Sequence, residues 1–229
     1  MNPLDLSRFV HMYDDAAIRK GIKLSIGFDF DEYISITEAV PTKGRTYPTF
    51  RPDRSPIKLG EGYWVVGVDK NKEVAHVQAA RLYDLSHSNL AEHLQSLKLF
   101  YANPAKHAHP NDRCVCRAPS AQKIAGRVVY HGDLWVRKDF RGQGMAKIMS
   151  RISIGASVAM WDPDFTCGLA GQWSVDKGVY DAPHREPGGS ILRLVAEDIE
   201  EEEWLFWRTA EELKTLIARQ DGSGLAVPS

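Results

Sequence analysis

Two glycines and an arginine stand just before a predicted helix, in the segment Arg141-Gly-Gln-Gly-Met-Ala146. The apolar residues Leu134 to Val136 before this segment predict the end of a strand, and the apolar spacing after it predicts a helix over residues 144–161. A strand that passes into a helix through glycines leaves backbone N–H groups pointing outward at the positive end of the helix dipole. The segment therefore predicts a binding site for a phosphate or pyrophosphate.

The size and composition of the chain indicate its class. With 229 residues, 43% apolar and 26% charged, it can bury a sizeable core and is predicted to form one domain of α/β or α+β type. A net charge of −1 gives no overall attraction to nucleic acid or an anionic membrane, and no apolar run approaches the ~20 residues of a membrane span. The N-terminus shows no apolar signal-peptide core, and the three cysteines do not suggest a secreted disulfide framework, so we expect a cytoplasmic protein.

The apolar pattern divides the chain into three regions. Residues 1–60 should hold a helix over 4–20 and a proline-rich, irregular segment over 33–60 that shapes a pocket on the core. Residues 61–220 should form the core and residues 221–229 a frayed tail. The elements predicted within the core are strands at 63–68 and 74–83, a helix at 90–100, a polar loop at 103–121, a strand at 127–136, a helix at 144–161, a strand at 165–170, a helix at 171–181, strands at 190–195 and 204–207, and a helix at 210–219.

Arg141, Gly144 and Ala146 match the three fixed positions of Arg/Gln-x-x-Gly-x-Gly/Ala, which is motif A of the GNAT superfamily of N-acetyltransferases. The chain resembles this family over about residues 61–215, because the motif follows a strand, precedes a long helix and comes after a hairpin like that of the family's second and third strands. The resemblance implies the GNAT acyltransferase fold, a mixed and mostly antiparallel sheet with helices on both faces. It also implies transfer of an acetyl group from acetyl-CoA to the amine of an unidentified, small-molecule acceptor by direct attack.

The resemblance implies acetyl-CoA as the co-substrate and no metal. The backbone of the motif would cradle the pyrophosphate, and the end of the preceding strand would pair with the pantetheine arm like an added strand. The implied cofactor-binding residues are Leu134, Trp135, Val136, Arg141, Gly142, Gln143, Gly144, Met145, Ala146 and Lys147. Lys138, Lys147 and Arg151 are near enough in sequence to meet the ribose phosphate, and a solvated surface charge is the alternative for each.

Acetyl transfer needs an acid for the leaving thiolate and a base for the amine. Many family members use a tyrosine after the fifth strand as the acid, which here is Tyr180, although the segment after it departs from the family pattern. For the base, the family often uses a water chain or a residue of the fourth strand, which points to Tyr130 and Asp133. Regular strand alternation would put Tyr130 and Gly132 on one face and His131 and Asp133 on the other. A water relay or a substrate-supplied nucleophile stays open.

Other functions stay open beside this one. The alternative is a GNAT-fold protein that binds acyl-CoA but is regulatory or catalytically silent. A transferase that uses a longer acyl group or aminoacyl-tRNA is compatible with the fold, but the chain has no basic face to support it. The expected partners are acetyl-CoA and an amine-bearing acceptor, without nucleic acid or membrane; a homodimer is left open.

Two further patterns have a possible functional interpretation beside a purely structural one. The residues His107, His109, Cys114 and Cys116 suggest zinc, but their spacing is not that of structural zinc sites, and a polar loop is the favoured interpretation. The acidic run 200–203 is predicted to be a solvated turn, which could also steer a cationic amine toward the protein.

Overall fold

The computed structural model describes residues 1–219 and shows one sheet of eight strands in the order β1-β2-β3-β5-β6-β8-β7-β4. Neighbouring strands are antiparallel except β5 and β6, which are parallel, so the predicted mixed and mostly antiparallel sheet is confirmed. The strands are β1 (Lys23–Gly27), β2 (Gly62–Val68), β3 (Val74–Leu85), β4 (Arg113–Val115), β5 (Gly126–Val136), β6 (Phe165–Gly171), β7 (His184–Leu194) and β8 (Ile199–Thr209).

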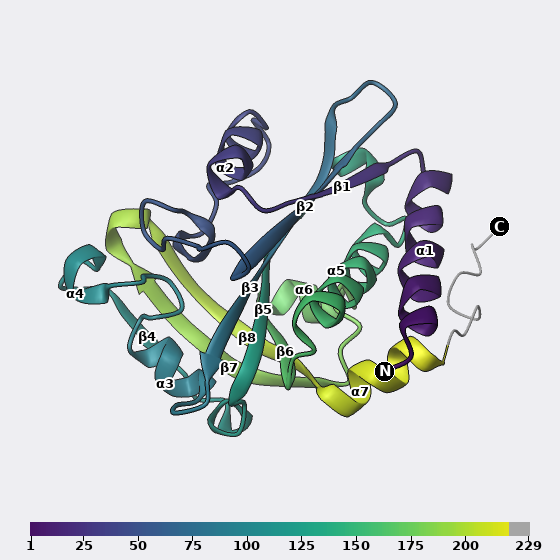
Figure 1. The fold of residues 1–229 in the computed structure, drawn as a ribbon. Coiled ribbons are helices and arrows are strands. Elements are labelled where there is room, and N and C mark those ends of the chain that lie inside the picture. Colours follow the sequence, from purple (N-terminus) through teal and green to yellow (C-terminus); the bar gives the residue numbers. More distant parts are fainter. Residues whose placement is uncertain (220–229) are drawn as a thin grey trace.

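Helices cover both faces of this sheet (Figure 1). They are α1 (Pro3–Arg19), α2 (Phe30–Glu38), α3 (Leu90–Gln95), α4 (Pro104–His107), α5 (Met145–Trp161), α6 (Gln172–Asp176) and α7 (Ala210–Ala218). The helices α1, α5 and α7 share one apolar cluster with one face of the sheet, while α2 and α3 share a second cluster with the opposite face. Of the helices in residues 1–219, none combines the length and the apolar character that crossing a bilayer requires.

The region before β2 is more ordered than its composition predicts. The expected first helix is present as α1, but β1 then pairs with β2 and adds a strand to the sheet. The segment expected to be irregular holds the end of α2, whose N-cap Asp29 accepts a 2.9 Å hydrogen bond from the N–H of Asp31. It also holds a short 3-10 turn over Pro48–Phe50. The tail predicted over residues 221–229 lies outside the described part of the chain.

In the core, each predicted strand and the long helix are present, but β7 and β8 begin six and five residues earlier than the strands expected at 190–195 and 204–207, and the shorter elements differ. The helix expected over 171–181 ends at Asp176, and the one expected over 90–100 ends at Gln95. The polar loop at 103–121 contains α4 and the edge strand β4. The acidic run is not a turn: residues 200–203 belong to β8, because ladder pairing with β7 and β6 outweighs the low strand propensity of glutamate.

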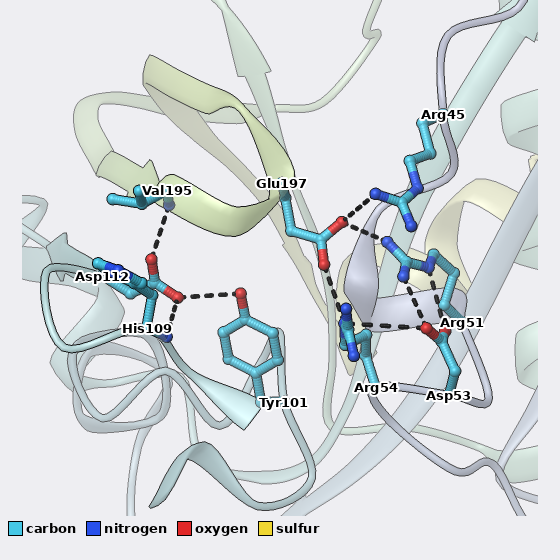
Figure 2. Close-up of polar contacts among 9 residues, drawn as sticks. All are labelled: Arg45, Arg51, Asp53, Arg54, Tyr101, His109, Asp112, Val195 and Glu197. Atoms are coloured by element: carbon cyan, nitrogen blue, oxygen red, sulfur yellow. Dashed lines mark hydrogen bonds and ion pairs between the residues drawn. The ribbon is translucent and has the colours of Figure 1, made fainter. Parts of the chain in front are cut away.

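Glu197 fixes the loop before β2 onto the β7–β8 hairpin (Figure 2). Its carboxylate is 2% exposed and lies 2.9 Å from a nitrogen of Arg45, 2.9 Å from Nε of Arg54, and within ion-pair contact of Arg51. The Arg51 guanidinium also pairs with Asp53 at 2.7 Å. Because carboxylates and guanidiniums satisfy one another here, these ion pairs add to the burial of Phe50 in giving the loop a defined place beside the sheet.

Candidate functional site

The two parallel strands at the centre of the sheet separate along their length. Within residues 1–219, β5 and β6 pair from Val128 to Tyr130 on the first strand, opposite Phe165 to Cys167 on the second. Both strands continue beyond these pairs, β5 to Val136 and β6 to Gly171. Backbone groups of β5 that face the gap therefore remain available to an extended ligand, which could pair with them like an additional strand.

A glycine cradle follows directly at the end of β5. Gly142 and Gly144 both have φ +75°, a left-handed conformation that glycine adopts without strain, and an added Cβ at either would meet no atom within 4 Å. In the described structure, no hydrogen-bond partner is found for the backbone N–H groups of Gly142, Gly144 and Met145, and α5 begins without a side-chain cap. These N–H groups stand at the positive end of a 17-residue helix, a position that suits the binding of an anion.

The side chains of Arg141 and Gln143 stabilise the conformation of the cradle. The Nε of Arg141 donates to the backbone oxygen of Val136 at 2.7 Å, and Nε2 of Gln143 donates to the oxygen of Asp139 at 2.7 Å. Both side chains therefore hold the turn against the end of β5 and the short 3-10 turn at Lys138–Phe140. In the described structure, the backbone N–H groups of Gly142, Gly144 and Met145 remain available to an anion.

Two pockets lie on opposite sides of the separated strands. The first lies on the α5 side, and its walls include Gln78, His131, Ile154 and Arg208. The second, with a volume of about 440 Å³, lies on the side of the loop before β2, and its walls include Tyr47, Phe50, Tyr130, Asp133, Trp173 and Glu203. Leu134 and Tyr180 line both pockets, so the two spaces meet beside these side chains.

Tyr180 stands at this junction, in the segment between α6 and β7. Its ring lies against that of Phe206, with 5.0 Å between the centroids. Burial, with a smaller effect from the Glu203 carboxylate, raises the pKa of Tyr180 well above its usual value. The hydroxyl therefore stays protonated near neutral pH and can donate a proton or a hydrogen bond to a group between the two pockets.

A bulge in β5 overturns the expected alternation of side chains. Val77 on β3 faces Trp135, whereas Ala79 faces Gly132, so β5 has one extra residue in this interval. Asp133 lies in the bulge with φ +54°. Its side chain therefore lines the same pocket as Tyr130 and Gly132, and the prediction that it shares a face with His131 is wrong.

The Asp133 carboxylate is fully engaged by neighbours. Its Oδ1 lies 2.9 Å from Nζ of Lys43, and its Oδ2 accepts from the hydroxyls of Tyr33 at 2.6 Å and Thr46 at 3.2 Å. Burial raises the pKa of Asp133, while Lys43 and the two hydroxyls act in the opposite direction. With both oxygens occupied, this carboxylate positions the loop before β2, and it has no free oxygen to offer an amine proton.

Tyr130 and His131, which are also on β5, are poor proton acceptors as well. Tyr130 is 8% exposed, and its ring stacks on Phe50 with 6.1 Å between centroids. Burial raises the pKa of Tyr130 well above its usual value, so it is neutral near pH 7 and a weak base. The Nε2 of His131 is 2.8 Å from Oγ of Ser157 on α5, and burial lowers the pKa of this histidine to about 4.

Basic side chains gather beside the first pocket. Arg151 on α5 is 5% exposed and pairs with Asp181, which lies 3.9 Å from Nζ of Lys147. In the described structure, Nε and Nη1 of Arg151 are buried without a hydrogen-bond partner. Burial, followed by repulsion from Arg151, lowers the pKa of Arg208 to about 10. Lys138 is exposed. An anionic ligand near Arg151 would satisfy groups that the protein leaves unpaired.

The metal interpretation gains no geometric support. Among residues 1–219, no group of three or more His, Cys, Asp or Glu side chains is arranged to hold a metal ion. Cys114 is buried on β4, and Nδ1 of His109 accepts a 3.1 Å hydrogen bond from the N–H of Asn111.

Glu203 is the site residue that the sequence did not reveal. It is 8% exposed on β8, and its Oε2 accepts a 2.7 Å hydrogen bond from Oγ of Ser190 on β7. Burial is the main cause that raises the pKa of Glu203 to about 7; the Ser190 hydroxyl opposes this effect and Glu201 adds to it. The period-two pattern of β8 could have identified it, because Glu203 continues the face of Leu205, which is fully buried.

No family model and no curated protein matches this chain. Among solved structures, the chain is similar to Arabidopsis thaliana NAA60 in complex with acetyl-CoA, at 13% identity and a TM-score of 0.45, covering 82% of this chain and 98% of that one. It is similar to mutant forms of the spermidine/spermine N-acetyltransferase SpeG from Vibrio cholerae, at 5% identity and 0.45, covering 86% and 98%.

A further similarity is to FeeM, an N-acyl amino acid synthase from uncultured soil microbes. The identity is 8% and the TM-score 0.40, and the alignment covers 96% of this chain and 93% of that one. These TM-scores describe a loose overlap of folds, so we rest the functional argument on the geometry of the site alone.

Proposed function

We propose that this protein is a GNAT-type N-acetyltransferase that moves an acetyl group from acetyl-CoA to the amine of a small acceptor. The observation that carries the proposal is the meeting of two pockets at Tyr180 and at Leu134, which lies on the strand that leads to the glycine cradle. One pocket lies against α5, the helix that begins at the cradle, and suits the donor. The other opens on the opposite side and suits an acceptor, so the two substrates can meet at the thioester without sharing a space.

The donor would be bound by main-chain groups along one path. The N–H groups of Gly142, Gly144 and Met145 would hold the pyrophosphate, because these donors are unpaired and lie at the start of α5. The pantetheine arm would extend along Leu134 to Val136 in the gap between β5 and β6, where backbone groups face no partner strand. The unpaired N–H groups of Arg151 would meet a further phosphate.

The chemistry follows from the position of Tyr180. The acceptor nitrogen attacks the thioester carbonyl carbon and forms the C–N bond, which gives a tetrahedral oxyanion. As the oxyanion collapses and the C–S bond breaks, the departing thiolate takes the proton of the Tyr180 hydroxyl. A tyrosine whose pKa is raised by burial suits this role, because it keeps its proton until the sulfur carries negative charge.

Two measurements on the purified protein test the proposal. Acetyl-CoA should raise the melting temperature, and a panel of small amines should include one that triggers release of free CoA thiol. Thermal stabilisation without thiol release from any amine would favour a catalytically silent acyl-CoA-binding protein. A folded protein that no CoA ester stabilises would contradict the assignment of the cradle itself.

A further inference from the structure

Glu203 is placed differently from the other carboxylates of the acceptor pocket, the second pocket described above. It lies on β8 opposite Gly171 of β6 and Ser190 of β7, just where β6 ends after separating from β5. Its side chain forms part of the pocket wall that also includes Tyr180. An acceptor bound in this pocket, as the proposed function requires, would therefore meet Glu203 and Tyr180 in one wall.

The Glu203 carboxylate has one partner and lacks a balancing cation. The Ser190 hydroxyl binds Oε2, while in the described residues Oε1 has no hydrogen bond and no lysine, arginine or histidine forms an ion pair with either oxygen. Asp133 in the same pocket has three donors on its two oxygens, one of them Lys43. A buried carboxylate without a cation binds a proton more readily than an exposed one.

We infer that Glu203 is the general base that takes the proton from the acceptor amine, an inference that rests on the proposed acetyltransferase function. The free Oε1 accepts one N–H proton of the entering ammonium and leaves a lone pair on nitrogen. The lone pair forms the C–N bond, the C–S bond breaks, and the sulfur takes the proton of Tyr180. The second ammonium proton leaves the nitrogen with amide formation and restores the Tyr180 hydroxyl through water, and the proton on Glu203 returns to solvent.

The groups around Glu203 favour a pKa near 7 for its carboxyl group. The titratable residues that face it are Tyr47 from the loop before β2, Cys114 from β4, Tyr130 from β5, Tyr180 from the segment after α6, and Glu201 from its own strand. None of these side chains can carry a positive charge, so none stabilises the Glu203 carboxylate as a cation would. Burial therefore raises the pKa of Glu203 to about 7, where an acceptor of protons is most effective.

The test is the pH profile of kcat/KM for an amine that the wild-type protein acetylates. In the wild type the rate should fall as the pH drops below about 7, because Glu203 becomes protonated. Glu203→Gln keeps an oxygen for the Ser190 hydroxyl but cannot take a proton. The kcat of this variant should be about 100-fold lower than that of the wild type at pH 7.5, and its rate should no longer fall as the pH drops below 7. Its Kd for acetyl-CoA should stay unchanged.

Two further variants test whether the pH dependence comes from Glu203. Ser190→Ala removes a hydrogen bond that favours the carboxylate, so the fall in rate should move to higher pH. Glu200→Gln, on the same strand but exposed and outside the pocket, should keep the wild-type profile. An unchanged profile in Glu203→Gln, with thiol release intact in the wild type, would overturn the inference alone. A wild-type protein that releases no thiol with any amine would overturn the proposed function, and the role of Glu203 with it.

Discussion

The Nζ of Lys43 lies 2.9 Å from Oδ1 of Asp133, ninety residues along the chain, and the two side chains are 3% and 5% exposed. This pair joins the loop before β2 to the bulge of β5. The loop forms a wall of the acceptor pocket, and the bulge turns Asp133 toward that wall. One buried ion pair therefore connects the pocket-shaping segment to the strand along which the donor is proposed to lie.

Breaking this pair should destabilise the protein. Lys43→Met leaves a buried carboxylate without its cation, and we expect the free energy of unfolding to fall by about 3 kcal/mol. Urea titration at pH 7 measures the loss. Lys70→Met changes an exposed lysine that forms no ion pair within residues 1–219; it is the control and should change stability by less than about 0.5 kcal/mol. Equal losses in the two variants would show that the Lys43–Asp133 pair does not hold the loop.

Gly144→Glu should abolish acetyl-CoA binding and leave the fold intact. The added side chain meets no atom within 4 Å, but it places a negative charge where the pyrophosphate would lie. The positive φ adds a cost of about 1 kcal/mol to stability. Gly60→Glu is a matched control, because Gly60 has φ +88° and an equally open Cβ position away from the cradle. Titration calorimetry should detect binding in the control alone; unchanged affinity in Gly144→Glu would refute the cradle.

Tyr180→Phe should lower kcat by about 100-fold, because the thiolate loses its proton donor. The ring keeps its packing on Phe206, so the affinity for acetyl-CoA and the melting temperature should change little. Thiol release under saturating acetyl-CoA measures the effect. Tyr101→Phe removes a hydroxyl that binds Asp112 outside both pockets and serves as the control. A kcat for Tyr180→Phe equal to that of the control would exclude Tyr180 as the acid.

His131 should make the protein less stable in acid. Burial lowers the pKa of His131 from 6.5 to about 4, so between these values the unfolded chain binds a proton that the folded protein does not. The contribution of His131 to stability is thus complete above pH 6.5 and is lost as the pH falls to 4, by about 3 kcal/mol at 1.36 kcal/mol per pKa unit. Burial also lowers the pKa of His76 to about 3 and the pKa of His93 to about 4.

Unfolding midpoints measured from pH 7 to pH 4.5 test this dependence. His131→Gln should reduce the slope of stability against pH, since one of the three buried imidazoles no longer titrates. His11→Gln, which changes an imidazole that is 76% exposed, should leave the slope as it is. Equal slopes in the wild type and in His131→Gln would mean that His131 is not held neutral by burial.

The elements with strong local patterns were predicted well from the sequence. The hairpin of β2 and β3, the strand β5 and the helix α5 combine regular apolar spacing with clear turn residues, and they lie where expected. The cradle followed from the glycines at 142 and 144, whose positive φ angles are the conformation for which glycine is suited. The errors that bear on the site lie at β8 and at the bulge in β5, where pairing with neighbouring strands decides the conformation.

The roles within the site could not be obtained in this way. Asp133 and Glu203 are both acidic residues on strands, and nothing in their local sequence says that the first is saturated by Lys43, Tyr33 and Thr46. Nor does it say that the second has a single partner in Ser190. These differences come from segments that are far apart along the chain, so they exist once the sheet and the loop before β2 are assembled.

The sequence by itself determined the donor side of the proposal, because a strand, two glycines and a helix start within a dozen residues form an anion site locally. The tertiary structure decided the acceptor side. The separation of β5 from β6 opens two pockets that meet at Tyr180, and burial without a cation gives Glu203 its raised pKa. Hydrogen-bond donors of the backbone follow from local conformation, whereas the proton affinity of a side chain depends on the solvent and charges that the whole fold places around it.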